Sequence, residues 1–316
     1  MKQTVIVIAG PTASGKSGIG IELAKKINGV VISADSMQIY KGLDVGTAKV
    51  KKDEACGIVH ELIDVIDIDE TFSVSQYKEM CYEKIDEVFD MGKTPIIVGG
   101  TGLYINAVVN NMNFEKVSAQ EEKIIDEQLE QLTFGKSSHE LHELLKSLDK
   151  QAAENIDEGN DKRVIRAIKL NLLGTKKSDI DNRHDLWHKN ESKYNFLVTY
   201  IDMPRDLLYD RINKRVDMMV SDGILDEVNL VYGQKDKNIT AVQAIGYKEF
   251  FDYIDGTKSL EDCIAVLKQK SRNYAKRQIT WFKKIQDKFV IDGTKTKEEI
   301  VETIIKEYNE KNKCRK

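Results

Sequence analysis

The sequence has few cysteines and no long hydrophobic run. Its four cysteines lie far apart and form no CxxC pair, which argues against a disulfide framework and against a zinc knuckle. The N-terminal apolar run, Thr4–Ala9, is six residues long. That is too short for a signal-peptide core and for the roughly 20 apolar residues of a membrane span. We therefore expect a cytoplasmic protein without a membrane anchor.

The sequence also lacks an excess of positive charge and has little proline. Lys and Arg number 48 against 52 Asp and Glu, so the formal net charge is −4. This excludes a basic coat over the whole surface, but a nucleic-acid partner needs only a local basic patch. The 316 residues, 41% of them hydrophobic, suffice to bury the core of one large domain or of two smaller ones. With only three prolines, few loop positions are marked by this residue.

Short β-branched runs alternate with helical patterns in the first hundred residues. We expect buried strands at Thr4–Ala9, Val30–Ala34 and Pro95–Val98, separated by helices at Ser17–Ile27 and Val74–Phe89. This alternation predicts an α/β fold, in which a parallel sheet is flanked by helices on both faces. Further strands are expected at Leu62–Val65, Phe196–Ile201 and Phe289–Ile291. The C-terminal helices are expected at Arg205–Met219, Ile224–Tyr232, Tyr247–Ile254 and Ser259–Lys284.

Residues 115–193 interrupt this alternation. The segment is polar and helix-rich, and the strand pattern resumes only at Phe196. From Glu115 to Asp161 it holds 13 acidic residues against five lysines, whereas Lys162–Lys177 holds six basic residues and no acid. We interpret 115–193 as a mostly helical insertion domain. The catalytic core then consists of residues 1–114 and 194–316, including the C-terminal helices.

Residues 10–17 read GPTASGKS and fit the G-x-x-x-x-G-K-[ST] pattern of a phosphate-binding loop. A predicted strand precedes the loop and a helix follows it, so the core is expected to be P-loop NTPase-like. The glycines let backbone N–H groups converge, the helix N-terminus adds partial positive charge, and Lys16 adds a full one. Ser17 is placed to hold a magnesium ion between phosphate oxygens. The expected ligands of a di- or triphosphate are Gly10, Pro11, Thr12, Ala13, Ser14, Gly15, Lys16 and Ser17.

Two other predicted strands lead into candidate active-site residues. The second strand runs into Asp35, and the fourth runs into Gly99–Gly102. Because ligands gather at the carboxyl ends of parallel strands, both should lie over the phosphate loop. Asp35 is then a candidate general base or metal–water ligand, and Thr101 a hydroxyl donor between glycines that admit a ligand closely. The alternatives are a loop cap for Asp35 and an ordinary strand-to-helix turn for Gly99–Gly102.

One predicted helix is strongly basic. Leu267–Lys284 carries seven Lys or Arg and no acid, with aromatic residues interleaved. A solvated helix normally mixes both signs, so this composition indicates a polyanionic partner. Lys162–Arg166, with Lys169, offers a second basic patch. The alternative is an ordinary surface helix in each case, with Trp281 packed into the core.

Seven motifs follow one another along the chain. They read GPTASGKS, ADSMQIYKGLDVGTAK, HELIDVID, VGGTGLY, NDKRVIRA, AIGYKE and KRQITWF. From residue 5 to about residue 284 the sequence therefore resembles the bacterial tRNA dimethylallyltransferases, also called tRNA isopentenyltransferases. DSMQIYKGLD-x-GTAK and GGTGLY after a phosphate loop are far more specific than the loop alone.

The resemblance implies a reaction. Enzymes of this family transfer the dimethylallyl group of dimethylallyl diphosphate to the N6 amine of the adenosine 3′ to the anticodon, at tRNA position 37. The products are N6-isopentenyladenosine and diphosphate, and magnesium assists. The match assigns Asp35 as the base for the N6 proton and Thr101 as a hydrogen-bonding group near the reacting centre. Lys16 and Arg215 then stabilise the departing diphosphate, and Ser17 holds the magnesium.

The resemblance also implies that tRNA binds through its anticodon stem-loop. The target base leaves its stack and is read by Asp35, Ser36, Met37 and Gln38, with Thr101 beside it. The other expected tRNA contacts are Lys123, Lys162, Arg163, Arg166, Gln243, Gly246, Tyr247, Lys248, Lys276, Arg277, Gln278 and Trp281. We expect the enzyme to be a monomer.

Two other functions remain open on the residues alone. A P-loop kinase of a small metabolite would use Asp35 as base for a substrate hydroxyl, but it leaves the acid-free basic helix without a role. A non-catalytic RNA-binding module of NTPase-like fold would use the basic patches and leave Asp35 and Thr101 idle. Binding of dimethylallyl diphosphate with weak ATP binding favours the transferase, and ATP turnover with a small acceptor favours the kinase.

Overall fold

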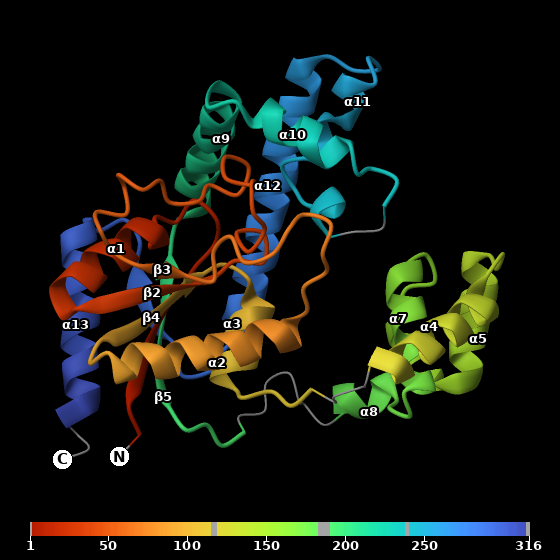
Figure 1. Cartoon of the computed structure of the whole chain (residues 1–316), viewed down its shortest axis with the longest axis horizontal. Coiled ribbons are helices and arrows are strands. Elements are labelled where there is room, and N and C mark those ends of the chain that lie inside the picture. The colour runs from red at the N-terminus through yellow and green to blue at the C-terminus, as the bar shows by residue number, and fades with distance from the viewer. Residues whose placement is uncertain (1, 115–118, 183–189, 238–239, 314–316) are drawn as a thin grey trace. The chain divides into compact units, whose positions relative to one another are not determined.

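The computed structural model describes residues 2–114, 119–182, 190–237 and 240–313. The chain divides into two compact units. The first consists of residues 1–109 and 191–316, and the second of residues 110–190. Figure 1 shows the elements of both units.

Within the described residues, a parallel sheet of six strands forms the centre of the first unit, in the order β3-β2-β4-β1-β5-β6. Every pairing in it is parallel, so the predicted α/β fold is confirmed. The strands are β1 (Thr4–Ala9), β2 (Gly29–Ala34), β3 (His60–Glu61), β4 (Thr94–Gly99), β5 (Asn195–Asp202) and β6 (Phe289–Asp292). β1 lies between β4 and β5, which places the end of β1 at the middle of the carboxyl edge, where ligands bind in such sheets.

The expected strand at Leu62–Val65 is wrong in position. The strand in this region, β3, has only two residues, His60 and Glu61, which pair with β2. Leu62 and Asp64 have left-handed backbones, with φ of 60° and 57°. A left-handed residue cannot continue an extended strand, so the apolar pattern here belongs to a loop.

Helices cover both faces of the sheet. The helices of this unit are α1 (Lys16–Ile27), α2 (Val74–Asp90), α3 (Gly102–Val109), α9 (Arg205–Ser221), α10 (Ile224–Tyr232), α11 (Phe251–Ile254), α12 (Leu260–Lys283) and α13 (Lys297–Lys313). α1 and α13 pack on one face, and α2 and α3 pack against β1, β2 and β4 on the other. Both faces are therefore apolar, which explains why β1 and β2 are buried at every position.

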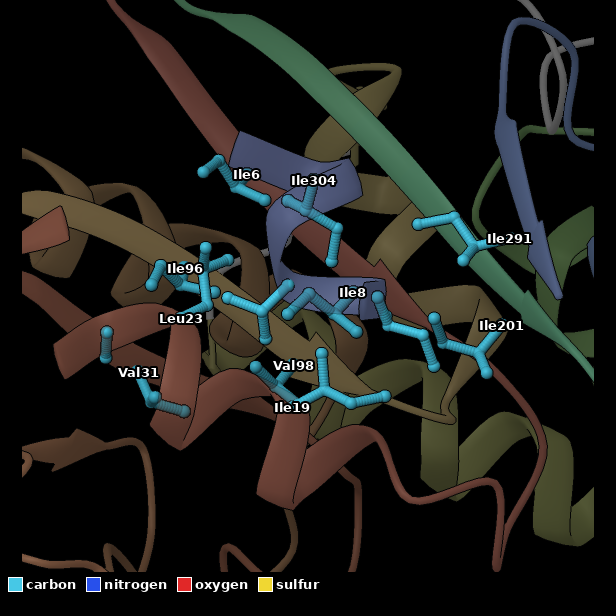
Figure 2. Close-up of a cluster of buried hydrophobic side chains, with 13 residues drawn as sticks. Ile6, Ile8, Ile19, Leu23, Val31, Ile96, Val98, Ile201, Ile291 and Ile304 are labelled. Carbon is cyan, nitrogen blue, oxygen red and sulfur yellow. The ribbon is translucent and has the colours of Figure 1, made fainter. Parts of the chain in front are cut away.

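Isoleucine dominates the core under α1 and α13. Figure 2 shows Ile6 and Ile8 of β1 beside Ile19 and Leu23 of α1, with Ile304 of α13 completing the cluster. These side chains are at most 2% exposed, and each contributes about 1.5–3 kcal/mol by its burial. The cluster fixes α1 against β1 and therefore fixes both ends of the phosphate loop between them.

The segment expected to be a helix at Tyr247–Ile254 is only partly α-helical. Lys248–Phe250 forms a 3-10 turn, η2, and α11 covers Phe251–Ile254. A second 3-10 turn, η1, covers Ala241–Gln243. Gly246 has φ of 113°, and its N–H donates to the Glu249 carboxylate at 2.9 Å. This backbone geometry prevents a regular helix from starting there.

The second unit is helical throughout its regular structure in the described residues. Its helices are α4 (Ala119–Thr133), α5 (Ser138–Leu148), α6 (Lys150–Asn155), α7 (Asp161–Leu172) and α8 (Lys177–Asn182). Its own core contains Leu141 and Leu145 of α5 and Val164 and Ile168 of α7. Lys169 joins α7 to α4 by an ion pair with Asp126 at 2.6 Å.

Three of the four cysteines lie within the described residues. Cys56, Cys81 and Cys263 are free thiols, and Cys314 lies outside the described residues. Within the described ranges, no helix has the length and apolarity needed to cross a membrane.

Candidate active site

The phosphate loop joins β1 to α1, as predicted. Gly15, immediately before the helix, has φ of 86°, and Ala13 has φ of 63°, so two left-handed residues curl the loop. Lys16 Nζ donates to the carbonyl of Pro11 at 3.1 Å and so lies across the curl. The buried Ser14 hydroxyl has no hydrogen-bond partner. An unpaired buried hydroxyl is a donor that a phosphate oxygen would satisfy.

Two cations and one carboxylate influence each other beside this loop. The pKa of Lys16 is lowered to about 8, chiefly because burial removes its hydration and secondly because Arg215 lies nearby, while Asp35 opposes both effects. Burial also lowers the pKa of Arg215, and the Asp35 carboxylate again opposes it. A ligand with more than one negative charge would relieve the repulsion between Lys16 and Arg215.

Arg215 of α9 connects the phosphate loop to a second loop. Its Nη1 donates to Thr12 Oγ1 at 2.9 Å, and its Nη2 donates to the Thr47 carbonyl at 3.3 Å. Its Nε is buried without a hydrogen-bond partner. The guanidinium therefore keeps a donor free beside the phosphate loop.

The ends of β2 and β4 come together as predicted. Thr101 Oγ1 accepts the Ser36 N–H at 3.0 Å, and the Thr101 N–H donates to the Ala34 carbonyl at 3.1 Å. Asp35 Oδ1 accepts the Met37 N–H at 2.9 Å. One oxygen of Asp35 thus caps its own loop. Asp35 also lines the cavities described below, so the residue can act both as a loop cap and as a site residue.

The glycines after β4 make room for the protein itself. Gly99 also lines the polar cavity described below, and the close approach of a ligand to these glycines stays a prediction. A Cβ would lie 2.2 Å from the Ala34 carbonyl oxygen at Gly99, 2.3 Å from Gln278 Nε2 at Gly100 and 2.2 Å from Trp281 Cδ1 at Gly102. The absence of side chains therefore lets β2 and α12 approach the loop.

Gln278 of α12 ties two active-site loops together. Its Oε1 accepts the Thr12 N–H at 2.8 Å, and its Nε2 donates to the Gly100 carbonyl at 2.9 Å. The side chain is only 5% exposed. Both polar atoms of this residue, for which we expected a tRNA contact, are engaged within the chain.

Two adjoining cavities open where these loops meet. A polar cavity of about 50 Å³ is lined by Lys16, Ser17 and Gln38. A larger cavity of about 260 Å³ has an apolar wall from α9 and α12 that includes Ile212 and Leu267. The residues that line both are Thr12, Asp35, Thr47, Arg215 and Tyr274. A charged group in the small cavity and an apolar or planar group in the large one would therefore meet at Asp35 and Arg215.

The remaining predicted residues of the first unit fall into three groups. Ser36, Met37, Gln243 and Gly246 line the large cavity. Lys248, Lys276 and Arg277 are exposed. Tyr247 is buried and donates to Glu227 at 3.0 Å, and the Trp281 ring lies over Gly102.

The predicted residues of the second unit lie on two of its helices. Lys162, Arg163 and Arg166 are exposed on the first half of α7. Lys123 is exposed on α4, 4.0 Å from Glu127. Their contact with tRNA stays a prediction.

Three residues that the sequence patterns do not single out also belong to the site. Thr47 and Tyr274 line both cavities, and burial together with the Asp35 carboxylate raises the pKa of Tyr274 to about 12. Glu227 holds the loop that contains Thr47. In the sequence, Thr47 belongs to the GTAK motif, and Tyr274 is one of the aromatic residues in the basic helix. Neither feature by itself indicates a site residue.

The described residues contain no cluster of three or more His, Cys, Asp or Glu side chains that could hold a metal ion on their own. An ion here would need oxygen ligands from a bound substrate as well as from the protein. The Ser17 hydroxyl, in the polar cavity beside Asp35, suits such an arrangement.

A model of the IPP transferase family matches residues 38–285, more than half of the chain. The chain belongs to the IPP transferase family. The tRNA dimethylallyltransferase of Acetivibrio thermocellus is 46% identical over 289 residues, which are 91% of each chain. A solved tRNA delta(2)-isopentenylpyrophosphate transferase of Staphylococcus epidermidis is 41% identical, with a TM-score of 0.71 over 98% of this chain and 100% of that one.

A more distant structure extends this family likeness. A eukaryotic dimethylallyltransferase acting on tRNA is 29% identical, with a TM-score of 0.75 over 92% of this chain and 74% of that one. Membership in the IPP transferase family makes the chain a transferase of the prenyl type. It therefore decides against the metabolite kinase and the non-catalytic RNA-binding module.

Proposed function

We propose that this protein is a tRNA dimethylallyltransferase. It moves the dimethylallyl group of dimethylallyl diphosphate to the N6 amine of the adenosine 3′ to the anticodon, at tRNA position 37, and releases diphosphate. The observation that carries the proposal is that Asp35 and Arg215 line both adjoining cavities, while Lys16 lines the polar one. The names of the relatives reported above, which are dimethylallyltransferases or isopentenylpyrophosphate transferases of tRNA, also support the proposal.

The diphosphate leaves into the polar cavity. Breaking the bond between the allylic C1 and oxygen places negative charge on the departing diphosphate. Lys16 and Arg215 line this cavity and are held in place, Lys16 by the Pro11 carbonyl and Arg215 by Thr12, so their positive charge is in position as the negative charge develops. The phosphate loop therefore binds a leaving group.

Magnesium fits the donor set around Ser17. A hydroxyl oxygen and diphosphate oxygens are hard ligands of the kind that magnesium prefers, and the ion usually binds with few protein ligands. When bound, magnesium neutralises part of the diphosphate charge. Ser17 holds the ion in this proposal, and Lys16 supplies the charge that the protein itself contributes.

Asp35 takes the proton from the attacking amine. As the bond from N6 to C1 forms and the C1–O bond breaks, N6 becomes acidic and passes a proton to the Asp35 carboxylate. Thr101, bonded to the Ser36 N–H, holds the loop that carries Asp35. On the same loop, Met37 contacts the adenine from the large cavity, and Gln38 contacts it from the edge of the polar cavity.

The apolar wall of the large cavity receives the prenyl group. Ile212 and Val216 of α9 and Leu267 of α12 line it. An apolar surround excludes water, which would otherwise compete with the amine for the allylic carbon. This arrangement favours transfer over hydrolysis.

Phosphate contacts hold the tRNA outside the cavities. Lys276 and Arg277 are exposed on α12, and Lys162, Arg163 and Arg166 are exposed on α7. Contacts of this kind are electrostatic and depend on salt concentration. The enzyme acts as a cytoplasmic monomer in this proposal, and light scattering after size-exclusion chromatography checks the monomer.

A transfer assay with radiolabelled dimethylallyl diphosphate, magnesium and unmodified tRNA tests the proposed function. We expect label in the adenosine next to the anticodon and none when that adenosine is replaced by guanosine. ATP with small hydroxyl acceptors serves as the comparison. Consumption of ATP without labelled tRNA would contradict the proposal.

A further inference from the structure

A carboxylate outside the two cavities holds a loop that leads into them. Glu227, in the first turn of α10, accepts three successive backbone N–H groups. Its Oε1 accepts those of Asp44 at 2.9 Å and Val45 at 2.6 Å, and its Oε2 accepts that of Gly46 at 3.0 Å. Successive N–H groups that converge in this way form an anion-binding nest. The chain fills this nest with its own side chain.

A buried tyrosine completes the contact on the other side of the carboxylate. The Tyr247 hydroxyl donates to Glu227 Oε2 at 3.0 Å, and the tyrosine is fully buried. A Cβ at Gly46 would lie 2.6 Å from the Tyr247 ring, so the glycine is required for this approach. Burial and the nearby carboxylate raise the pKa of Tyr247, so its hydroxyl keeps the proton that it donates.

The carbonyl side of the same loop faces the active site. The Thr47 carbonyl accepts Arg215 Nη2 at 3.3 Å and Gln38 Nε2 at 3.3 Å. Gln38 Nε2 also approaches the Ala48 carbonyl at 3.4 Å. The N–H groups held by Glu227 and the carbonyls that orient Gln38 and Arg215 therefore lie within five consecutive residues.

A lysine fixes the base of the loop independently. Lys49 Nζ donates to the Tyr40 carbonyl at 2.6 Å, to Asp44 at 2.7 Å and to Asp64 at 2.5 Å. Its side chain is only 6% exposed. Loss of Glu227 would therefore loosen residues 44–47 without releasing the loop from the rest of the protein.

We propose that Glu227 is a positioning residue for the transfer reaction. By holding the N–H groups of residues 44–46, it places the Thr47 carbonyl, which in turn orients Gln38 and Arg215. Glu227 itself touches no substrate. The inference rests on the proposed function, in which Gln38 contacts the adenine and Arg215 binds the diphosphate.

Glu227→Gln tests the inference, with Asp226→Asn as its matched control. Glutamine has nearly the same shape, but it removes the charge and turns an amide donor toward backbone donors. Asp226 is exposed on the same helical turn. Asp226→Asn therefore changes the net charge by the same amount and also removes one negative charge from the N-terminus of α10. We expect the single-turnover transfer rate to fall about 10- to 100-fold in Glu227→Gln. It should stay within about twofold in Asp226→Asn.

Two further measurements separate positioning from general destabilisation. If Glu227 is a positioning residue, Glu227→Gln lowers the single-turnover rate, but all of the enzyme still reacts. The fold-loss in rate that Glu227→Gln causes should then be at least about threefold smaller in a Gln38→Ala background than in the wild type. Amide exchange of residues 44–46 should rise at least about tenfold in Glu227→Gln and not in the control. A loss of reacting fraction at an unchanged rate, or full additivity with Gln38→Ala, would overturn the inference.

Failure of the inference and failure of the proposed function give different results. A wild-type enzyme that transfers no label contradicts the proposed function. A working wild type, with Glu227→Gln equal to Asp226→Asn in both rate and amide exchange, contradicts only the role of Glu227.

Discussion

Gln278 is the residue whose loss should affect both the stability and the activity of the site. Replacement by leucine keeps the side chain at a similar size and removes both of its hydrogen bonds. The Thr12 N–H in the phosphate loop and the Gly100 carbonyl after β4 then lose their partners. Because α12 is the element that supplies the bridge, the two loops would no longer be held to the same helix.

The magnitude follows from the burial of the two orphaned groups. Each buried polar group that loses its partner costs about 1–3 kcal/mol. Thr12 is partly exposed, whereas Gly100 is buried, so we expect a total in the lower half of the range for two groups, about 2–4 kcal/mol. For a unit of this size that corresponds to a fall in Tm of about 4–16 °C. A shift of the loops by about 1 Å would slow transfer by up to about 100-fold.

Thermal unfolding and single-turnover transfer together measure these effects. Gln269→Leu is the control, since Gln269 is exposed on the same helix. We expect the control to unfold near the wild-type temperature and to transfer at the wild-type rate. If Gln278→Leu matched Gln269→Leu in both measurements, the bridging role of Gln278 would be refuted.

Three other consequences are open to direct measurement. Because the pKa of Lys16 is lowered to about 8, Lys16 loses its positive charge as pH rises through that value. The affinity for diphosphate, measured by calorimetry, should therefore fall above about pH 8, and it should fall less in Lys16→Arg, which keeps its charge. A Cβ at Gly99 would lie 2.2 Å from the Ala34 carbonyl oxygen, so Gly99→Ala should lower the unfolding free energy by at least about 1–3 kcal/mol, whereas Gly18→Ala, which meets only the flexible end of a lysine, should not. Arg163→Ala should weaken tRNA binding and reduce its salt slope by about 1 without changing diphosphate affinity; equal salt slopes would exclude a phosphate contact at this residue.

The sheet and the phosphate loop were predictable because local patterns determine them. β1 is confirmed at its predicted bounds, Thr4–Ala9, since strands buried on both faces are continuous apolar runs. α10 is also confirmed at Ile224–Tyr232. The strand expected at Leu62–Val65 fails because left-handed backbone conformations at two of its residues end β3 early, and nothing in the apolar pattern signals them.

The contacts that position the site were not predictable, because they join residues far apart in the sequence. Gln278 lies 266 residues from Thr12, within a basic helix whose composition directs attention to its charged neighbours. The space that side chains at Gly99, Gly100 and Gly102 would need is occupied by atoms of β2 and α12. Glu227 lies more than 180 residues from the loop that it holds. The structural roles of such glycine, glutamine and glutamate residues depend on tertiary contacts that the local sequence does not indicate.

In the proposed reaction, Asp35 accepts the proton from N6. Asp35→Asn is the variant that isolates this role, since its amide oxygen can still accept the Met37 N–H that Oδ1 accepts at 2.9 Å, while the base is lost. The measurement is the single-turnover rate with tRNA and dimethylallyl diphosphate already bound. We expect this rate to fall about 100- to 10,000-fold, with both binding affinities unchanged within about threefold. Transfer at close to the wild-type rate would contradict it and place the base on another residue.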